Sequence, residues 1–501
     1  MNKYQLSPFC LDDSFSAFSP CHWILAEQLS DHSINYPFSI KFLLGYLLRY
    51  NFSDFFNKLM SRLADSSNSA KASYGLCIAR KIVESCKLSD RIYLCFVPFT
   101  SSLDSIFVVH ESMYLYLSPE QLANLSGDTP SSLSSYLLQY KGWSPYSGVS
   151  LCAEGIVSEL SSFKLPCSLP LHFPKSVIHY QTLFTSHIQP SPDRKSVSLF
   201  GLGNYSKTII LPCISAHWQL NSLHEIDPSQ ISGIWFKKFS NVSSSPFPNS
   251  ADLNSSVWFI ASYHHTHAAT AEQALQNSII PVIEKPLFTT LEQLNSFRHL
   301  LASLESPTFF SCFQKRYQTF NSFIYDDLSV EPGDPINMSA FVFEIPLPKY
   351  HWYNWPNSRS RIISNACHWI DYFFYVNAYA DVESIDRFIS SSAIEVISIT
   401  LINSAHCLIS ITDFGSSRLG VREHIELRTR CAQSIITDSS TYVSENSTSV
   451  IRRVTVNPLS AHKNMYNSIM TKIKHSLPGD SVRTLLSSEI ALKLDLSPPL
   501  R

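Results

Sequence analysis

Glycine and charged residues are both scarce in this chain. Only 13 of its 501 residues are glycine, which is about a third of the usual share of about 7%. Charged residues make up 16% of the chain, against about 25% in typical globular proteins. Basic residues number 38 and acidic residues 40, and neither sign forms a long run. We therefore expect no nucleic-acid partner and no anionic membrane surface, since both are bound by clustered basic residues.

Long apolar segments and paired cysteines are also missing. The longest apolar stretches, such as 394–402, are interrupted by polar residues before the roughly 18 apolar residues that a membrane-spanning helix needs. The amino terminus has no basic segment leading into an apolar one, so we expect no export signal. The 12 cysteines form no C-x-x-C pair, which argues against a zinc ribbon or a disulfide framework. These features predict a cytoplasmic protein with reduced thiols.

The order of predicted elements divides the chain. Its hydrophobic share of 45% can form large cores, and its length is typical of about two to four domains. A segment with prolines and charges at 186–196 predicts a linker, and residues 1–185 predict a mixed α/β region. Alternating strands and helices over 197–308 predict an α/β domain with a parallel sheet. Alternating β segments over 309–501 predict an α+β domain with an open, antiparallel-rich sheet. The strands expected in the parallel sheet are 197–200, 220–225, 257–261 and 279–283, and the helices are 206–214, 267–276 and 291–304.

Two of the few glycines, Gly201 and Gly203, stand two apart between a predicted strand and a predicted helix. This is the context of a dinucleotide-binding turn, in which the first glycine allows the tight turn and the second lets a pyrophosphate approach the backbone. Asn204 and Tyr205 continue the turn, and Ser206 stands at the position of a third glycine. The functional interpretation is a Rossmann domain, and the alternative is a glycine turn without a ligand.

An acidic residue follows at the distance expected for such a domain. Glu225 lies 22 residues beyond Gly203, at the end of the next predicted strand, where a carboxylate can bind both ribose hydroxyls. This favours NAD over NADP as the cofactor, because an NADP site favours Arg at the position where Ile226 follows. Asp227 is the competing candidate, and an acid in a solvated loop is the interpretation without a function.

Four ordered segments resemble the Gfo/Idh/MocA family of oxidoreductases. They are GLGNYS at 201–206, ASYHHTHAATAEQAL at 261–275, VIEKPLFTTLEQL at 282–294 and ACHWIDYF at 366–373. The phrases FQKRY at 313–317, IPLPKYHWYNWP at 345–356 and REHIEL at 422–427 are similar to a subfamily fused to an alcohol-dehydrogenase-like half and associated with polysaccharide assembly. The resemblance covers about residues 196–495. It implies a Rossmann domain followed by an α+β domain whose sheet floors the substrate site.

The resemblance also implies roles for individual residues. Lys285 would approach the nicotinamide and the reacting hydroxyl, with Glu284 and Pro286 fixing it through a cis Lys285–Pro286 bond. His368 would be the acid/base residue, and Asp371 lies one helical turn later on the same face. The cofactor site would further include Ser262, His264 and His267, and the substrate site would include Arg316, Trp352, Arg361 and Asn365.

Two departures from the family pattern bear on activity. The acidic residue usual just before the histidine is replaced, leaving Ser364 and Asn365, and the family's Asn-Arg-Arg phrase is here Gln-Lys-Arg at 314–316. Three functions therefore stay open. The first is an NAD-dependent dehydrogenase or reductase acting on a sugar or nucleotide sugar, the second an NAD-using glycosidase, and the third a catalytically silent binding or scaffold protein.

Three further expectations complete the interpretation. The histidines at 264, 265 and 267 are expected to lie beside the nucleotide and to hold no metal, because no Cys or carboxylate stands nearby at ligand spacing. Residues 72–118 resemble, more faintly, the alcohol-dehydrogenase part of the fused proteins in a degenerate form, which predicts a structural or substrate-shaping role for 1–185. The resemblance also implies a homo-oligomer formed through the carboxyl-terminal sheet.

Overall fold

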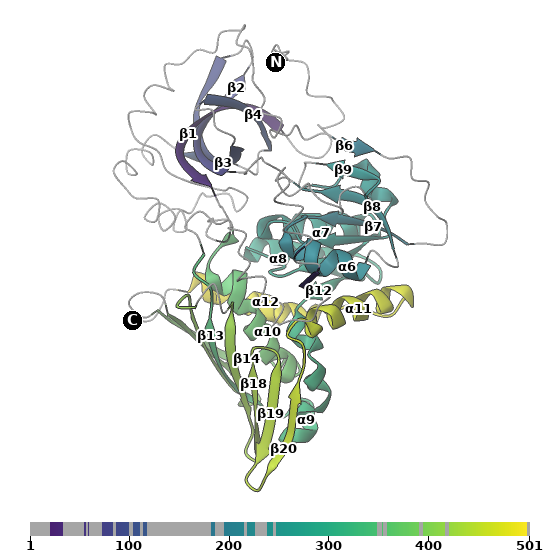
Figure 1. Ribbon diagram of the computed structural model, residues 1–501, viewed down its shortest axis with the longest axis vertical. Helices are drawn as coiled ribbons and strands as arrows, with labels where there is room; N and C mark the ends of the chain where they lie inside the picture. The colour runs from purple at the N-terminus through teal and green to yellow at the C-terminus, as the bar shows by residue number, and fades with distance from the viewer. Residues whose placement is uncertain are drawn as a thin grey trace.

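The computed structural model describes most of the chain after residue 194 and the backbones of six earlier strands (Figure 1). The ranges described with side chains are 195–214, 218–225, 238–243, 247–347, 358–389, 394–415 and 420–497, together with residues 55, 56, 59 and 353. Within these ranges no helix is long and apolar enough to cross a membrane.

The first sheet belongs to the amino-terminal region and is antiparallel. Its strands are β1 (Cys21–Ser33), β2 (Ser73–Val83), β3 (Lys87–Phe99), β4 (Asp104–His110) and β5 (Tyr114–Leu117), in the order β4-β1-β2-β3-β5. The β-rich runs expected within 91–117 are confirmed as parts of β3, β4 and β5. The remainder of residues 1–185, apart from β6 described below, lies almost wholly outside the described residues.

The second sheet is the parallel sheet that the sequence predicts. Its strands are β6 (Thr182–Thr185), β7 (Ser196–Phe200), β8 (Gln219–His224), β9 (Asn241–Ser243), β10 (Val257–Ile260), β11 (Ile280–Glu284) and β12 (Phe310–Cys312), in the order β12-β11-β10-β7-β8-β9-β6. All neighbours are parallel except β6 and β9. Every residue of β10 is buried, as expected for a strand covered by helices on both faces.

Helices follow the strands at the expected positions. η4 (Ser206–Ile210) and α6 (Leu211–Ile214) follow β7, α7 (His267–Gln276) follows β10, and α8 (Leu291–Ser303) follows β11. The first of these segments is a π-helix that continues directly into α6. The α/β expectation for this part of the chain is confirmed.

The third sheet has eight strands and is mostly antiparallel. They are β13 (Asn337–Phe343), β14 (Val382–Ile389), β15 (Glu395–Leu401), β16 (His406–Thr412), β17 (Arg422–Arg428), β18 (Ala432–Thr437), β19 (Thr441–Asn446) and β20 (Val450–Thr455). Burial alternates along β13, β16 and β17, so one face carries the core and the other is open. The core face packs against α9 (Ile324–Leu328), α10 (Cys367–Val376) and α12 (Leu486–Leu496) (Figure 1).

The two larger sheets are joined more closely than a boundary at residue 309 implies. Strand β12 lies beyond that boundary, yet it is the edge of the parallel sheet. Helix α11 (Ser460–Lys474) returns from the third sheet and buries Met465, Tyr466 and Ile469 in the core beneath β7 and β10. The carboxyl-terminal part of the chain thus completes the domain built on the parallel sheet.

Candidate functional site

The first part of the site is the turn after β7. Gly201 has φ of +98°, and a Cβ there would lie 2.4 Å from the carbonyl oxygen of Ala261. Its N–H donates to the carbonyl oxygen of His224 at 2.7 Å. Both the backbone conformation and the close approach of the next strand therefore require glycine at this position.

Gly203 lies beside open space. A Cβ at this position would meet nothing within 4 Å, so the protein itself does not exclude a side chain. The helix starts directly after it, and its first N–H groups lack partners within the helix. Exposed Asn204 and buried Ser206 lie in this first turn. Open space beside a backbone at a helix N-terminus is what a pyrophosphate needs, so the turn fits a dinucleotide.

Glu225 lies beside the same turn, at the end of β8. It is buried, and its Oε2 accepts a hydrogen bond from the N–H of Leu202 at 2.6 Å. The acid that the sequence predicts as the ribose ligand is thus held next to the glycine turn. The competing residue, Asp227, lies outside the described residues.

The second part of the site is a cavity of about 430 Å³ between the parallel sheet and the third sheet. It is lined by eight of the residues that the sequence predicts, which come from both domains: Tyr205, Ser262, His264, His267, Glu284, Lys285, Asn365 and His368. Lys285 and His368, which are far apart in the chain, therefore face one pocket.

Lys285 is held at the end of β11 by the expected cis bond to Pro286. Its Nζ donates to the carbonyl oxygen of Ser364 at 2.8 Å, with longer contacts to the hydroxyl of Tyr353 at 3.4 Å and to Asn365 Oδ1 at 3.5 Å. Burial lowers the pKa of Lys285, but nearby Tyr353, Cys367 and Glu284 outweigh it and the pKa lies above its ordinary value. The amine is therefore charged, and its contacts point across the cavity to the second domain.

The residues around Lys285 fix the loop that carries it. The ring nitrogens of His267 lie 2.8 Å from the carbonyl oxygen of Pro286 and 3.0 Å from that of Ser262. Burial lowers the pKa of His267, against the opposing effect of its contacts with these two carbonyl oxygens. Glu284 accepts a hydrogen bond from the hydroxyl of Tyr466 on α11, and burial raises its pKa to about 6. These contacts fix the residues on both sides of Lys285.

His368 presents an unused nitrogen. Its buried Nδ1 has no hydrogen-bond partner among the described residues. Burial, together with the charges of Lys285 and Lys315, holds the pKa of His368 well below its ordinary value. Buried polar atoms without a partner are rare in native structures. The ring of His368 lines the cavity, whereas its Nδ1 is enclosed by protein.

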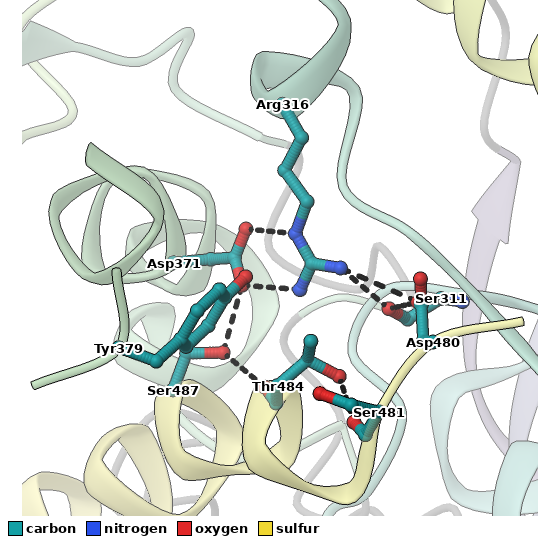
Figure 2. A network of polar contacts seen from close by, with 8 residues as sticks. All are labelled: Ser311, Arg316, Asp371, Tyr379, Asp480, Ser481, Thr484 and Ser487. Carbon is teal, nitrogen blue, oxygen red and sulfur yellow. Dashed lines mark hydrogen bonds and ion pairs between the residues drawn. The ribbon is translucent and has the colours of Figure 1, made fainter. Parts of the chain in front are cut away.

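Arg316 and Asp371 correct two of the sequence predictions. Figure 2 shows that they bind each other: Nε and Nη2 of Arg316 donate to the two carboxylate oxygens of Asp371 at 2.8 and 2.6 Å. Nη1 of Arg316 donates to Ser311 and Asp480, and Ser487 donates to Asp371. Neither residue lines the cavity. Because all the guanidinium nitrogens and both carboxylate oxygens are engaged, the pair acts in the fold and is not placed to bind substrate or to move a proton.

Of the other two predicted substrate residues, the structure describes only Arg361, which does not line the cavity. Arg361 binds Oε2 of Glu344 through Nε at 2.9 Å and Asp413 through Nη2 at 3.1 Å, so it acts on a lining residue without lining the cavity itself. Trp352 lies outside the described residues. Its neighbour Tyr353 does line the cavity.

The cavity also contains charged residues that the sequence did not single out. Buried Lys315 pairs with Glu423 at 2.5 Å, and Trp369 donates to the same carboxylate at 2.7 Å. His462 of α11 lies 2.9 Å from the hydroxyl of Tyr205, and burial lowers its pKa to about 4. Glu344 ends β13. The only sequence signal for Lys315 was its place in the Gln-Lys-Arg phrase, and none marked Glu344 or His462.

Solved structures match this arrangement, whereas no protein-family model matches the chain and no curated protein matches its sequence. A UDP-N-acetylglucosamine 3-dehydrogenase from Acidithiobacillus ferrooxidans matches with a TM-score of 0.50 at 14% identity, over 60% of this chain and 97% of that one. A levoglucosan dehydrogenase, solved with NADH and levoglucosan, matches with a TM-score of 0.50 at 14% identity, over 60% of this chain and 95% of that one.

The similarity to these solved structures supports the fold assignment. The neighbours are oxidoreductases of the Gfo/Idh/MocA type, and they lend no support to a fused alcohol-dehydrogenase-like half. The chain has the two-sheet fold of these dehydrogenases, a Rossmann-type parallel sheet followed by a mostly antiparallel one.

Proposed function

We propose that the protein is a nicotinamide-dependent oxidoreductase that acts on a sugar or nucleotide sugar, with NAD preferred to NADP. The observation that carries this proposal is the convergence of Lys285 and His368, from two domains, on one cavity. The glycine turn supports it independently, because it fits a dinucleotide. A cytoplasmic role in polysaccharide synthesis is part of the same proposal and rests on the sequence resemblance.

The residues would divide the work of the reaction. The turn from Gly201 to Ser206 would hold the pyrophosphate, and Glu225 the adenosine ribose. A nicotinamide ring bound at the cavity supplies an acceptor or donor for hydride. Lys285 would bind the reacting oxygen, because a charged amine there stabilises the negative charge that develops as the carbon loses hydride. His368 would contact the substrate, because its ring lines the same cavity.

A panel of sugars and nucleotide sugars, each tested with NAD and with NADP, tests the proposal. We expect substrate-dependent NADH formation from at least one member of the panel. Release of an aglycone from glycosides without net NADH would favour the glycosidase. NAD binding with neither signal would favour the silent binding protein, and failure to bind either dinucleotide would overturn all three.

The cofactor preference depends on Glu225. Replacing it with Ala removes the proposed ribose ligand and also the acceptor for the N–H of Leu202. We expect Glu225→Ala to weaken NAD binding more than NADP binding, measured by fluorescence titration. Equal weakening of NAD and NADP binding would mean that Glu225 only supports the glycine turn, through Leu202, and does not bind the ribose.

The open face of the third sheet supports the proposed homo-oligomer. Phe341 and Phe343 of β13 are about half exposed, at 49% and 45%, and Leu408 of β16 is 38% exposed. Apolar residues gathered on one open sheet face favour association. Light scattering tests this, and a monomer at micromolar concentration would contradict it.

A further inference from the structure

Glu344 is a buried carboxyl in the cavity for which neither the sequence nor the proposed roles of Lys285 and His368 provide a use. It directly follows β13, and its residue is 7% exposed. Its N–H donates to the carbonyl oxygen of Thr412 at 2.7 Å, and its own carbonyl oxygen accepts from the N–H of Gly415 at 2.9 Å. A Cβ at Gly415 would lie 2.2 Å from that carbonyl oxygen. The backbone is therefore fixed, and the side chain has a defined direction.

The side chain is connected to Lys285. The carboxylate of Glu344 interacts with the side chain of Asn365, and Asn365 Oδ1 in turn lies 3.5 Å from Lys285 Nζ. Its other partner is Arg361, which binds Oε2 at 2.9 Å. Glu344, Asn365 and Lys285 thus form a polar chain along one wall of the cavity.

The other carboxyls that line the cavity are engaged elsewhere. Glu423 accepts hydrogen bonds from Lys315, Trp369 and Ser439. Asp438 binds Arg422 at 2.8 Å. Glu284 is held by Tyr466, on the α11 side of the lysine. Among the described lining carboxyls, Glu344 is the one whose hydrogen-bond chain leads to Lys285 through a single side chain.

We propose that Glu344 is the catalytic proton acceptor, taking the proton of the sugar hydroxyl whose oxygen Lys285 binds. This inference rests on the proposed function. During oxidation the hydroxyl O–H bond breaks and its proton moves to a carboxylate oxygen of Glu344. The C–H bond breaks, its electron pair leaves with the hydrogen as hydride to the nicotinamide dinucleotide, and a carbonyl forms. In reduction the protonated carboxyl returns the proton.

The charges around Glu344 suit this role. Burial raises the pKa of Glu344 to about 7, against the opposing effects of Arg361 and Lys285, and Glu395 on β15 raises it further. Asp413 faces it through Arg361. An acid/base works best when its pKa is near the working pH. Burial and the charges of Lys285 and Lys315 hold the pKa of His368 well below its ordinary value, which makes its imidazole a weaker base.

The pH dependence of kcat/KM in wild type, Glu344→Gln and Glu344→Asp tests the proposal, with exposed Glu305→Gln as the matched control. In the oxidation direction, wild-type activity should rise with pH through about 7 as the carboxyl loses its proton. In the reduction direction it should fall over the same range. Glu344→Gln should lose about 10²–10⁴-fold in activity and lose this pH dependence, whereas Glu344→Asp and Glu305→Gln should keep it.

A second measurement does not need turnover. Infrared titration of the protein without substrate should show a carboxyl that deprotonates at a pH of about 7 in wild type and is missing in Glu344→Gln. The Glu284 carboxyl, with a pKa of about 6, should titrate in both proteins. Absence of that signal from wild type would overturn the proposal. So would a Glu344→Gln variant whose kcat/KM keeps the wild-type change with pH near 7, which we call the pH limb. Failure of wild type to oxidise or reduce any sugar would overturn the proposed function and this inference with it. An active wild type with an unchanged Glu344→Gln profile would overturn this inference alone.

Discussion

Gly201 and Gly203 differ in what surrounds them, and this difference separates folding from cofactor binding. An alanine at Gly201 would have an unfavourable φ of +98° and a Cβ 2.4 Å from Ala261. The backbone conformation alone costs about 1–2 kcal/mol, so we expect Gly201→Ala to lower the free energy of unfolding by at least this amount in urea denaturation.

Gly203→Ala is the matched variant. Because its Cβ would meet no protein atom within 4 Å, we expect the free energy of unfolding to change by no more than about 0.5 kcal/mol. NAD affinity should nevertheless fall, measured by titration, since the methyl group would occupy the path of the pyrophosphate. Unchanged NAD affinity in Gly203→Ala would mean that no dinucleotide passes this turn.

Arg361 provides a further test of the charge around Glu344. Removing a cation that lies 2.9 Å from the carboxylate disfavours ionisation. We therefore expect Arg361→Gln to move the pH limb of oxidation to higher pH without abolishing the maximal rate. A limb that moves to lower pH, or does not move, would contradict the assignment of that limb to Glu344.

The sequence predicts some residues of the candidate site and not others. The glycines and Glu225 could be predicted because each stands at a fixed position relative to a strand or helix. Lys285 and His368 were predicted only from the resemblance to a known family. Arg316 and Asp371 were misassigned because the partner of each lies 55 residues away, and no local pattern reports such a pairing.

Between elements, the ion-pair network of Figure 2 connects the segment after β12 to α10 and α12. Removing one partner of a buried pair costs about 3–5 kcal/mol, and the loss here should lie at the lower end, about 3 kcal/mol, because Arg316 keeps Asp480 as a partner at 3.3 Å. We expect Asp371→Asn to lower the free energy of unfolding by this amount. Glu489→Gln, which breaks the more exposed Arg298–Glu489 pair, should cost only about 0.2–1 kcal/mol.

Measuring the turnover rate of Asp371→Asn separates a structural role of Asp371 from a catalytic one. If Asp371→Asn kept the wild-type free energy of unfolding but lost activity, the catalytic role predicted from the sequence would be correct. Loss of stability with activity retained in the folded fraction supports the structural role.

The elements themselves were predictable to different degrees. The strands and helices from β7 to α8 follow from hydrophobic periodicity, because a parallel sheet covered by helices has continuous apolar strands. The return of α11 to the first core was not predicted. Periodicity identifies the buried face formed by Met465, Tyr466 and Ile469, but it does not report which sheet covers that face.

At the scale of the whole molecule, buried histidines make the fold sensitive to acid. The pKa values of His264, His267, His368 and His462, all of which line the cavity, lie below their ordinary value because of burial. Below pH of about 6.5 the unfolded chain takes up protons that the folded chain does not. Their contribution to stability is therefore lost as pH falls through this range. The raised pKa values of Glu284 and Glu344 act in the opposite direction, since the folded state holds those protons more tightly.

His462 provides a quantitative test of this sensitivity. Its pKa of about 4 against an ordinary 6.5 corresponds to about 3 kcal/mol. Between pH 6.5 and pH 4 the free energy of unfolding should fall in both proteins, and the fall should be about 3 kcal/mol smaller in His462→Gln than in wild type. Exposed His299→Gln is the control. An unchanged pH slope in His462→Gln would show that the imidazole is protonated in the folded state.

The most direct test of the central claim is a comparison of Lys285→Ala with wild type for two quantities, the rate of sugar-dependent NADH formation and the dissociation constant for NAD. Because Lys285 would act chiefly in the transition state, the rate should fall by at least about 10²-fold while NAD affinity changes by only a few-fold. A Lys285→Ala variant that turns over as fast as wild type, or a wild type that binds NAD and oxidises no sugar, would contradict the claim.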